Sequence, residues 1–178
     1  MKFIKDILLF DIETSGPDTD KDVVVQFSAV LLDKDNLLEK GAYHTYIKNS
    51  MLQQVLKEQA IGAHANIEQV QGGKKPLDFV RELPLVFPTP VTLASAGLSR
   101  VFFLKGVFRK QAVTFPFEMN ILDLWTVYYI YGVRAGLKKI PTLHTLAEQL
   151  HMRIQNPYDA NERVRLHAAF FRHLIKEL

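Results

Sequence analysis

The chain has 178 residues, of which 48% are hydrophobic and 23% are charged, as is ordinary for a soluble globular protein with a sizeable core. It contains no cysteine, which excludes disulfides, thiolate metal sites and cysteine nucleophiles. The net charge of +3 is unevenly spread along the chain. Residues 1–99 carry 10 Lys and Arg against 13 Asp and Glu, whereas residues 100–178 carry 12 Lys and Arg against 6 Asp and Glu. This division fits a metal site beside a phosphate-binding surface, and it equally fits ordinary solvated helices.

The first part of the chain alternates between extended runs and turn signals. An apolar stretch at residues 4–11 predicts a strand, and the Ser, Gly, Pro and Asp of residues 15–18 end it in a turn. A second apolar run at residues 23–32 predicts a central strand, which a polar turn at 33–36 separates from the alternating pattern of 42–47. We therefore expect three antiparallel strands at the start of the chain.

Helical patterns become frequent after this point. Pro76 opens a short predicted helix, and Pro84 disfavours its continuation. The remaining predicted elements are a strand at 91–95, a helix at about 98–110, a strand at 117–122, a helix at 123–131, a helix capped by Thr142 and a last helix from about 161 to the C-terminus. Strands first and then strands alternating with helices predict an α/β fold, a mixed sheet with helices on its faces.

The organisation of the chain is expected to be simple. No repeat, low-complexity segment or linker divides it, so residues 1–178 are predicted to form a single domain. The apolar run before Asp11 is too short for a signal peptide or a membrane span, so the expected location is cytoplasmic, without a membrane partner.

Two carboxylates, Asp11 and Glu13, directly follow the apolar residues 7–10. Side chains at i and i+2 of a strand point to the same face, so both acids are expected to converge at the end of a buried strand. Convergent carboxylate oxygens suit Mg²⁺ or Mn²⁺, which proteins usually hold by one or two carboxylates plus substrate phosphates. Two like charges so close together repel each other unless a cation or an arginine lies between them.

These features resemble the 3′–5′ exonuclease superfamily (DEDD exonucleases) of the bacterial DNA polymerase proofreading subunit, RNase T and oligoribonuclease. Residues 11–16, Asp-Ile-Glu-Thr-Ser-Gly, match the first motif of that family. Further similarities over nearly the whole chain lie at residues 25–30, 61–64, 122–124 and 142–147. The resemblance implies a ribonuclease H-like fold and hydrolysis of phosphodiester bonds at the 3′ ends of single-stranded DNA or RNA.

The resemblance also implies a set of site residues. Family members hold two divalent cations with four carboxylates, and a His near the last of these activates the attacking water. Asp11 and Glu13 match the first two carboxylates, while Ser99 takes the place of the mid-chain Asp. His167 takes the place of the late Asp, and Glu162 that of the general base. A remodelled Mg²⁺ or Mn²⁺ site would then use Asp11, Glu13 and His167 as metal ligands, with Glu162 completing the catalytic set.

Substrate contacts are expected from two short segments. Thr14 and Ser15 follow the acid pair and would place backbone groups near the terminal nucleotide. Ser99 and Arg100 begin the predicted helix at 98–110, and Arg100 opens a row of basic residues that could line a phosphate track. A solvated helix face explains the same row equally well.

Several of these residues also have simple structural interpretations. Ser99 suits the N-terminus of a helix, and Asp159 with Glu162 has the spacing of a capping box. His167 lies on the apolar face of the last helix, where an isolated His is more often a satisfied core residue than a ligand.

Two functional hypotheses follow from these patterns. The first is a working Mg²⁺- or Mn²⁺-dependent 3′–5′ exonuclease with a remodelled site. The second is a domain that no longer hydrolyses nucleic acid, but binds single-stranded 3′ ends or a protein partner; a homodimer is a further possibility. The intact first motif favours the first hypothesis, and the replacements at Ser99, Glu162 and His167 favour the second.

Overall fold

The computed structural model describes residues 2–48, 67–87 and 89–177, so the family-like segment at residues 61–64 lies outside the described residues. The described elements in chain order are β1 (Ile7–Thr14), β2 (Val24–Leu32), β3 (Glu39–Tyr46), α2 (Ile67–Gln71), α3 (Pro76–Val86), β4 (Thr92–Ser95), α4 (Ser99–Lys110), β5 (Ile121–Asp123), α5 (Leu124–Arg134), α6 (Leu143–Gln149) and α7 (Ala160–Glu177). Within the described ranges, no helix combines the length and apolar character that crossing a bilayer requires.

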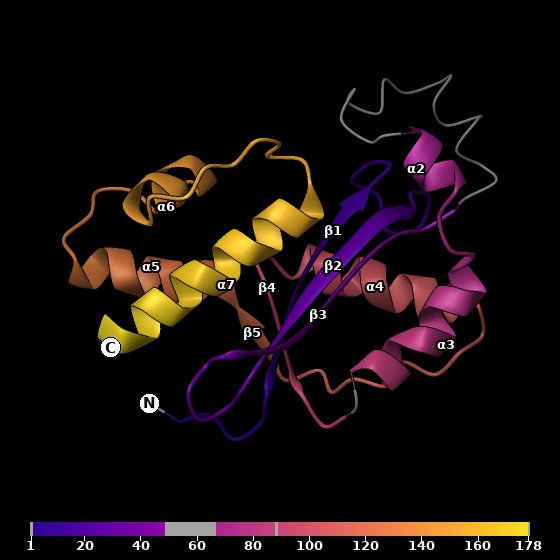
Figure 1. The fold of residues 1–178 in the computed structure, drawn as a ribbon, viewed down its shortest axis with the longest axis horizontal. Helices are drawn as coiled ribbons and strands as arrows, with labels where there is room; N and C mark the ends of the chain where they lie inside the picture. Colours follow the sequence, from indigo (N-terminus) through magenta and orange to yellow (C-terminus); the bar gives the residue numbers. More distant parts are fainter. Residues whose placement is uncertain (1, 49–66, 88, 178) are drawn as a thin grey trace.

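Five strands form one mixed sheet with the order β3-β2-β1-β4-β5 (Figure 1). β1 pairs antiparallel with β2, and β2 pairs antiparallel with β3, which confirms the predicted three-stranded start. On the other side of β1, β4 pairs parallel with β1, and β5 pairs parallel with β4. The carboxyl ends of β1, β4 and β5 therefore lie at the same edge of the sheet, the edge at which open α/β sheets bind their ligands.

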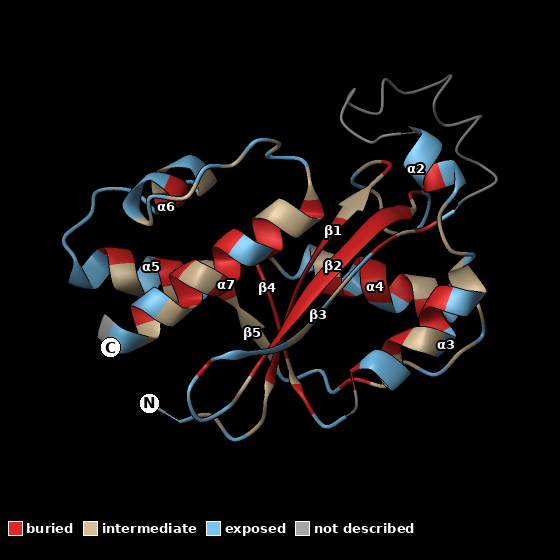
Figure 2. Ribbon diagram, viewed as in Figure 1, coloured by how far each residue is buried: buried red, intermediate tan, exposed pale blue. Residues whose placement is uncertain are grey.

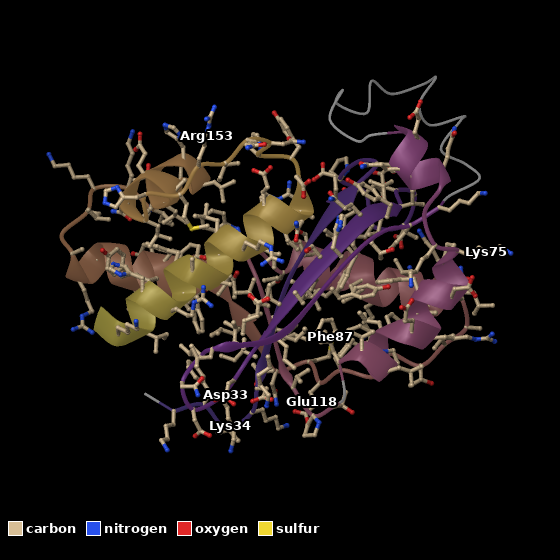
Figure 3. The ribbon with its side chains drawn as sticks, viewed as in Figure 1. Asp33, Lys34, Lys75, Phe87, Glu118 and Arg153 are labelled. Atoms are coloured by element: carbon tan, nitrogen blue, oxygen red, sulfur yellow. The ribbon has the colours of Figure 1, made fainter. Side chains whose placement is uncertain are left out.

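Helices cover both faces of this sheet, so the domain has three layers. One core cluster joins even-numbered residues of β1 to α3 and α4, and it includes Phe87, labelled in Figure 3. The other cluster joins odd-numbered residues of β1 to α5, α6 and α7. β2, which lies between these helical layers, is buried along its whole length (Figure 2). The alternation of side chains along β1 thus decides which residues face α7.

Most predicted elements lie close to their expected bounds, with two differences. α3 continues through Pro84 to Val86, because a proline in the last turn removes only one helical hydrogen bond near a terminus. β5 spans three residues rather than the predicted 117–122. The predicted cap at Thr142 is present and accepts a hydrogen bond from the Thr145 N–H. Asp123 caps α5 in the same way and accepts a hydrogen bond from the Trp125 N–H.

Candidate functional site

The acid pair lies at the carboxyl end of β1, on the face that α7 covers. Ile7 and Leu9 belong to the core cluster beneath α7, so the strand alternation carries Asp11 and Glu13 to the same face. The Asp11 side chain is only 1% exposed, whereas that of Glu13 is 26% exposed. The predicted convergence of the two carboxylates is therefore observed, with the Asp11 carboxylate buried and the Glu13 carboxylate partly exposed to solvent.

Arg163, in the first turn of α7, bridges the two carboxylates. Its Nε donates to Asp11 Oδ2 at 2.7 Å, and its Nη2 lies 2.9 Å from Glu13 Oε2. The same guanidinium also donates to two backbone oxygens, that of Ile12 at 2.9 Å and that of Pro157 at 3.1 Å. With only 9% of its side chain exposed, Arg163 is a buried cation with every nitrogen hydrogen-bonded.

A second arginine reaches Asp11 from α4. Arg100 donates from Nε to Asp11 Oδ1 and from Nη1 to the backbone oxygen of Ala96. The sharp turn from β4 into α4 contains Gly97 at a φ of +108°, a conformation that other residues rarely adopt. Nη2 of Arg100 has no hydrogen-bond partner among the described residues, and the side chain is 26% exposed. This nitrogen is the cationic donor that remains available.

The two guanidinium groups set the ionisation of the acids. Burial raises the pKa of Asp11, but the charges of Arg100 and Arg163 outweigh burial and hold that pKa below its ordinary value. Burial also raises the pKa of Glu13, and here the opposing charge of Arg163 does not cancel the effect. Asp11 is therefore a fixed anion, and Glu13 is the more easily protonated acid of the pair.

His167 lies one helical turn beyond Arg163 and is buried. Its Nδ1 is 2.8 Å from the hydroxyl of Tyr128, and its ring stacks on the Tyr128 ring at a centroid distance of 5.8 Å. Burial lowers the pKa of His167 to about 4, against the raising effect of the Asp11 charge. His167 is accordingly a neutral, hydrogen-bonded core residue, as its structural interpretation predicted, and its role as a metal ligand stays a prediction.

Glu162 is hydrogen-bonded to the loop that precedes α7. Its Oε2 accepts hydrogen bonds from the backbone N–H groups of Gln155 at 2.6 Å and Asn156 at 3.1 Å. Asp159 caps α7 by accepting from the Glu162 N–H at 3.3 Å, so this half of the predicted capping box is present. The structure thus uses Glu162 to hold the loop before α7, and does not bring it to Asp11 and Glu13.

The four predicted substrate contacts divide into two groups. Thr14, Ser99 and Arg100 line a cleft of about 480 Å³ beside Glu13 and Arg163. Ser15 is 5% exposed and turns away: its hydroxyl donates to Asp22 Oδ1 at 2.8 Å and thereby holds the β1–β2 loop. The cleft lies where β1 ends and where α4 and α7 begin.

No protein-family profile matches the chain, and no curated protein matches its sequence significantly. Solved structures do match. Cell-death related nuclease 4 has a TM-score of 0.77 and 14% identity over 99% of this chain and 65% of its own. E. coli Exonuclease I with a dT13 oligonucleotide has a TM-score of 0.74 and 16% identity over 95% of this chain and 40% of its own.

A structure of a 3′-exonuclease, which concerns its 3′-end specific recognition of a histone mRNA stem-loop, also matches. Its TM-score is 0.71, with 15% identity over 99% of this chain and 65% of that protein. This chain thus spans less than two thirds of each of these three proteins. The chain has the exonuclease fold. The predicted ribonuclease H-like α/β architecture is therefore confirmed, with almost no support from sequence identity.

The exonuclease fold implies divalent cations at the acid pair, but the residues present do not fit them. Both oxygens of Asp11 already accept from guanidinium groups, and Glu13 is paired with one of the same groups. A cation would have to displace two arginines whose charges repel it. No cluster of three or more Asp, Glu, His or Cys side chains suited to a metal occurs in the described ranges.

Sequence reasoning anticipated an arginine between the acids only as an alternative to a metal, and did not identify Arg163. A signal was nevertheless present. Each arginine directly follows a position at which the exonuclease resemblance expected a catalytic group: Arg100 follows Ser99, and Arg163 follows Glu162. Both positions lie in the first turn of a helix that begins near the carboxyl end of β1, so the residue that follows each of them can reach the same acids.

Proposed function

We propose that this exonuclease-fold domain binds the 3′ end of a single-stranded nucleic acid without hydrolysing it. The observation that carries the proposal is the guanidinium of Arg163 bridging Asp11 and Glu13, where a nuclease would need a divalent cation. Arginine can neutralise the acids and can bind phosphate, but it cannot lower the pKa of a coordinated water. Binding is therefore the part of the ancestral chemistry that these residues support.

The charge of the site favours phosphate binding. The two acids are balanced by the two arginines, so an approaching phosphodiester meets no net negative charge. Arg100 presents its open Nη2, and the exposed Ser99 at the N-terminus of α4 adds a hydroxyl and the positive end of the helix dipole. Both residues belong to the lining of the cleft, where the phosphodiester next to a 3′ end would meet these donors.

The structural neighbours support the choice of ligand. E. coli Exonuclease I has been solved with a dT13 oligonucleotide, and the 3′-exonuclease structure concerns recognition of the 3′ end of a histone mRNA stem-loop. Those are properties of longer proteins, of which this chain spans a part. Their shared ligand, a nucleic-acid strand, is what we infer for the cleft here, whereas their other activities are not transferred.

Hydrolysis by two metal ions, the first hypothesis from sequence, makes the opposite prediction. We expect no shortening of a 5′-labelled single strand of DNA or RNA in Mg²⁺ or Mn²⁺ on denaturing gels. Release of 3′ nucleotides that disappears in the Asp11→Asn variant would overturn the proposal and establish a remodelled nuclease. Release that persists in the Asp11→Asn variant would identify a contaminating nuclease, to be removed before the assay is read.

The binding proposal is tested at Ser99, which is exposed and lines the cleft. Replacing Ser99 by Asp should weaken binding of a single strand about tenfold, because a negative charge close to a partly solvated phosphate costs about 1 kcal/mol or more. Ser99→Asn is the matched control of similar size without charge, and should change affinity little. Fluorescence anisotropy in EDTA measures both variants, so a metal held by the added carboxylate cannot contribute.

Two further comparisons make the result specific. Arg81→Gln removes an exposed positive charge from α3, outside the residues that line the cleft, and should leave affinity nearly unchanged. A circular single strand should compete poorly with a linear one, because it has no 3′ end. Equal competition would reject the recognition of ends, and affinity no better than that of a neutral control protein would reject nucleic-acid binding altogether.

A further inference from the structure

A cluster of exposed apolar side chains lies on α5 and the segment that follows it, on residues that do not line the cleft. Thirteen large hydrophobic residues are exposed in the described part of the chain, and five of them fall within residues 129–140. These five, Tyr129, Ile130, Val133, Leu137 and Ile140, are 42–62% exposed. We call them the α5 patch. Figure 2 shows the exposed residues of α5 at one end of the molecule, with α7 beside the helix.

The α5 patch is not flat. Residues of the helix and of the following segment line a hollow of about 160 Å³, among them Tyr129, Val133 and Leu137. A cavity of about 150 Å³ holds one benzene ring, so this hollow suits a single large apolar side chain. Protein interfaces commonly place such an anchor in a pocket at their centre.

Basic residues border the hollow, and no Asp or Glu is among the described residues that line it. The stretch from Leu124 to Ala147 contains no Asp or Glu, but it contains Arg134, Lys138 and Lys139. All three are exposed, and none forms an ion pair with another of the described residues. Lys138 and Lys139 belong to the lining of the hollow itself. An apolar hollow rimmed by unpaired cations is complementary to an anionic segment that carries an apolar side chain.

We propose that the α5 patch binds an acidic segment of another protein, with one large apolar side chain of that segment in the hollow. A second copy of this chain is disfavoured, because a two-fold contact would bring the same lysines together. A nucleic-acid strand is disfavoured because four of the five apolar side chains are aliphatic and offer no stacking surface. The hollow favours a protein segment over a lipid surface, which would meet a protruding apolar face rather than fill a recess.

The test is a selection from a random peptide library displayed on phage, with the full chain as bait and the Val133→Asp variant for counter-selection. We expect enrichment of peptides that are acidic and contain a Phe, Trp or Leu. Val133 is 62% exposed, so its replacement should not disturb the core. No enrichment over the counter-selection, or enrichment of basic or purely apolar peptides, would overturn the proposal.

A selected peptide, labelled with fluorescein, then allows quantitative controls. Lys138→Glu should weaken its binding at least tenfold, and raised salt should weaken it further. Leu85→Asp, at another strongly exposed apolar position on α3, should leave binding unchanged. The oligonucleotide assay of the cleft should be unaffected by Lys138→Glu, so the two proposals can fail separately. Two other results would overturn the proposal by assigning the α5 patch to a different partner. These are binding of the wild type to vesicles of anionic lipid, or self-association of the wild type, that the Val133→Asp variant has lost.

Discussion

Replacing Arg163 by methionine is expected to lower the free energy of unfolding by about 3–5 kcal/mol, the range measured when one partner of a buried ion pair is removed. The reason is Asp11, whose side chain is 1% exposed and which would keep its charge with Arg100 as its one remaining counter-ion. The backbone oxygens of Ile12 and Pro157 would also lose their donor. Urea denaturation followed by circular dichroism measures the loss.

Arg165→Met provides the matched control for this prediction. Arg165 lies two residues further along α7, is 49% exposed and is 3.8 Å from Glu39, so its removal should change stability by less than about 0.5 kcal/mol. Combining Arg163→Met with Asp11→Asn should destabilise the protein less than the sum of the two single changes. A loss below about 1 kcal/mol for Arg163→Met would show that the bridge does not hold the acids.

The second large effect concerns pH. Burial lowers the pKa of His167 to about 4 in the folded protein, whereas an unfolded His titrates near its ordinary value of 6.5. The unfolded chain therefore binds this proton first, and stability should fall as the pH decreases from about 6.5 to about 4. The shift corresponds to a loss on the order of 3 kcal/mol once both states are protonated. Above pH 6.5 the contribution is fully retained.

The difference between the wild type and a His167→Gln variant isolates this effect from other titrating groups. Glutamine cannot titrate, so the stability of the His167→Gln variant should depend less on pH between about 6.5 and about 4. The lost hydrogen bond with Tyr128 should lower the stability of this variant at every pH. His173→Gln, at an exposed position of the same helix, should keep the pH dependence of the wild type. Parallel curves for the wild type and His167→Gln would contradict the buried, neutral state.

The order of strands and helices was predictable because it depends on local patterns. Period-two alternation identified β1, and it placed Asp11 and Glu13 on one face before any tertiary contact was known. Proline, threonine and aspartate signals located several helix starts in the same way. Pro84 does not end α3, contrary to the prediction, because it falls in the final turn of the helix.

The occupants of the site were less predictable, because they depend on contacts between distant parts of the chain. Arg163 meets Asp11 across more than 150 residues only because α7 packs on β1 and β2. Nothing in the local sequence distinguishes Arg163 from Arg165, whose side chain points to Glu39 instead. The motif resemblance points to Ser99 and Glu162, whereas the arginines that contact the acids are the residues directly after them.

The packing of α7 on β1 has a consequence for synthesis of the protein. α7 is translated long after β1, yet it covers a face of that strand and supplies one of the two counter-ions for the acid buried there. A nascent chain lacking α7 would leave that face of the sheet open to water and Asp11 with a single arginine. We therefore expect the domain to complete its folding only after residues 160–177 have left the ribosome. Until then, β1, β2 and β3 should remain only partly ordered.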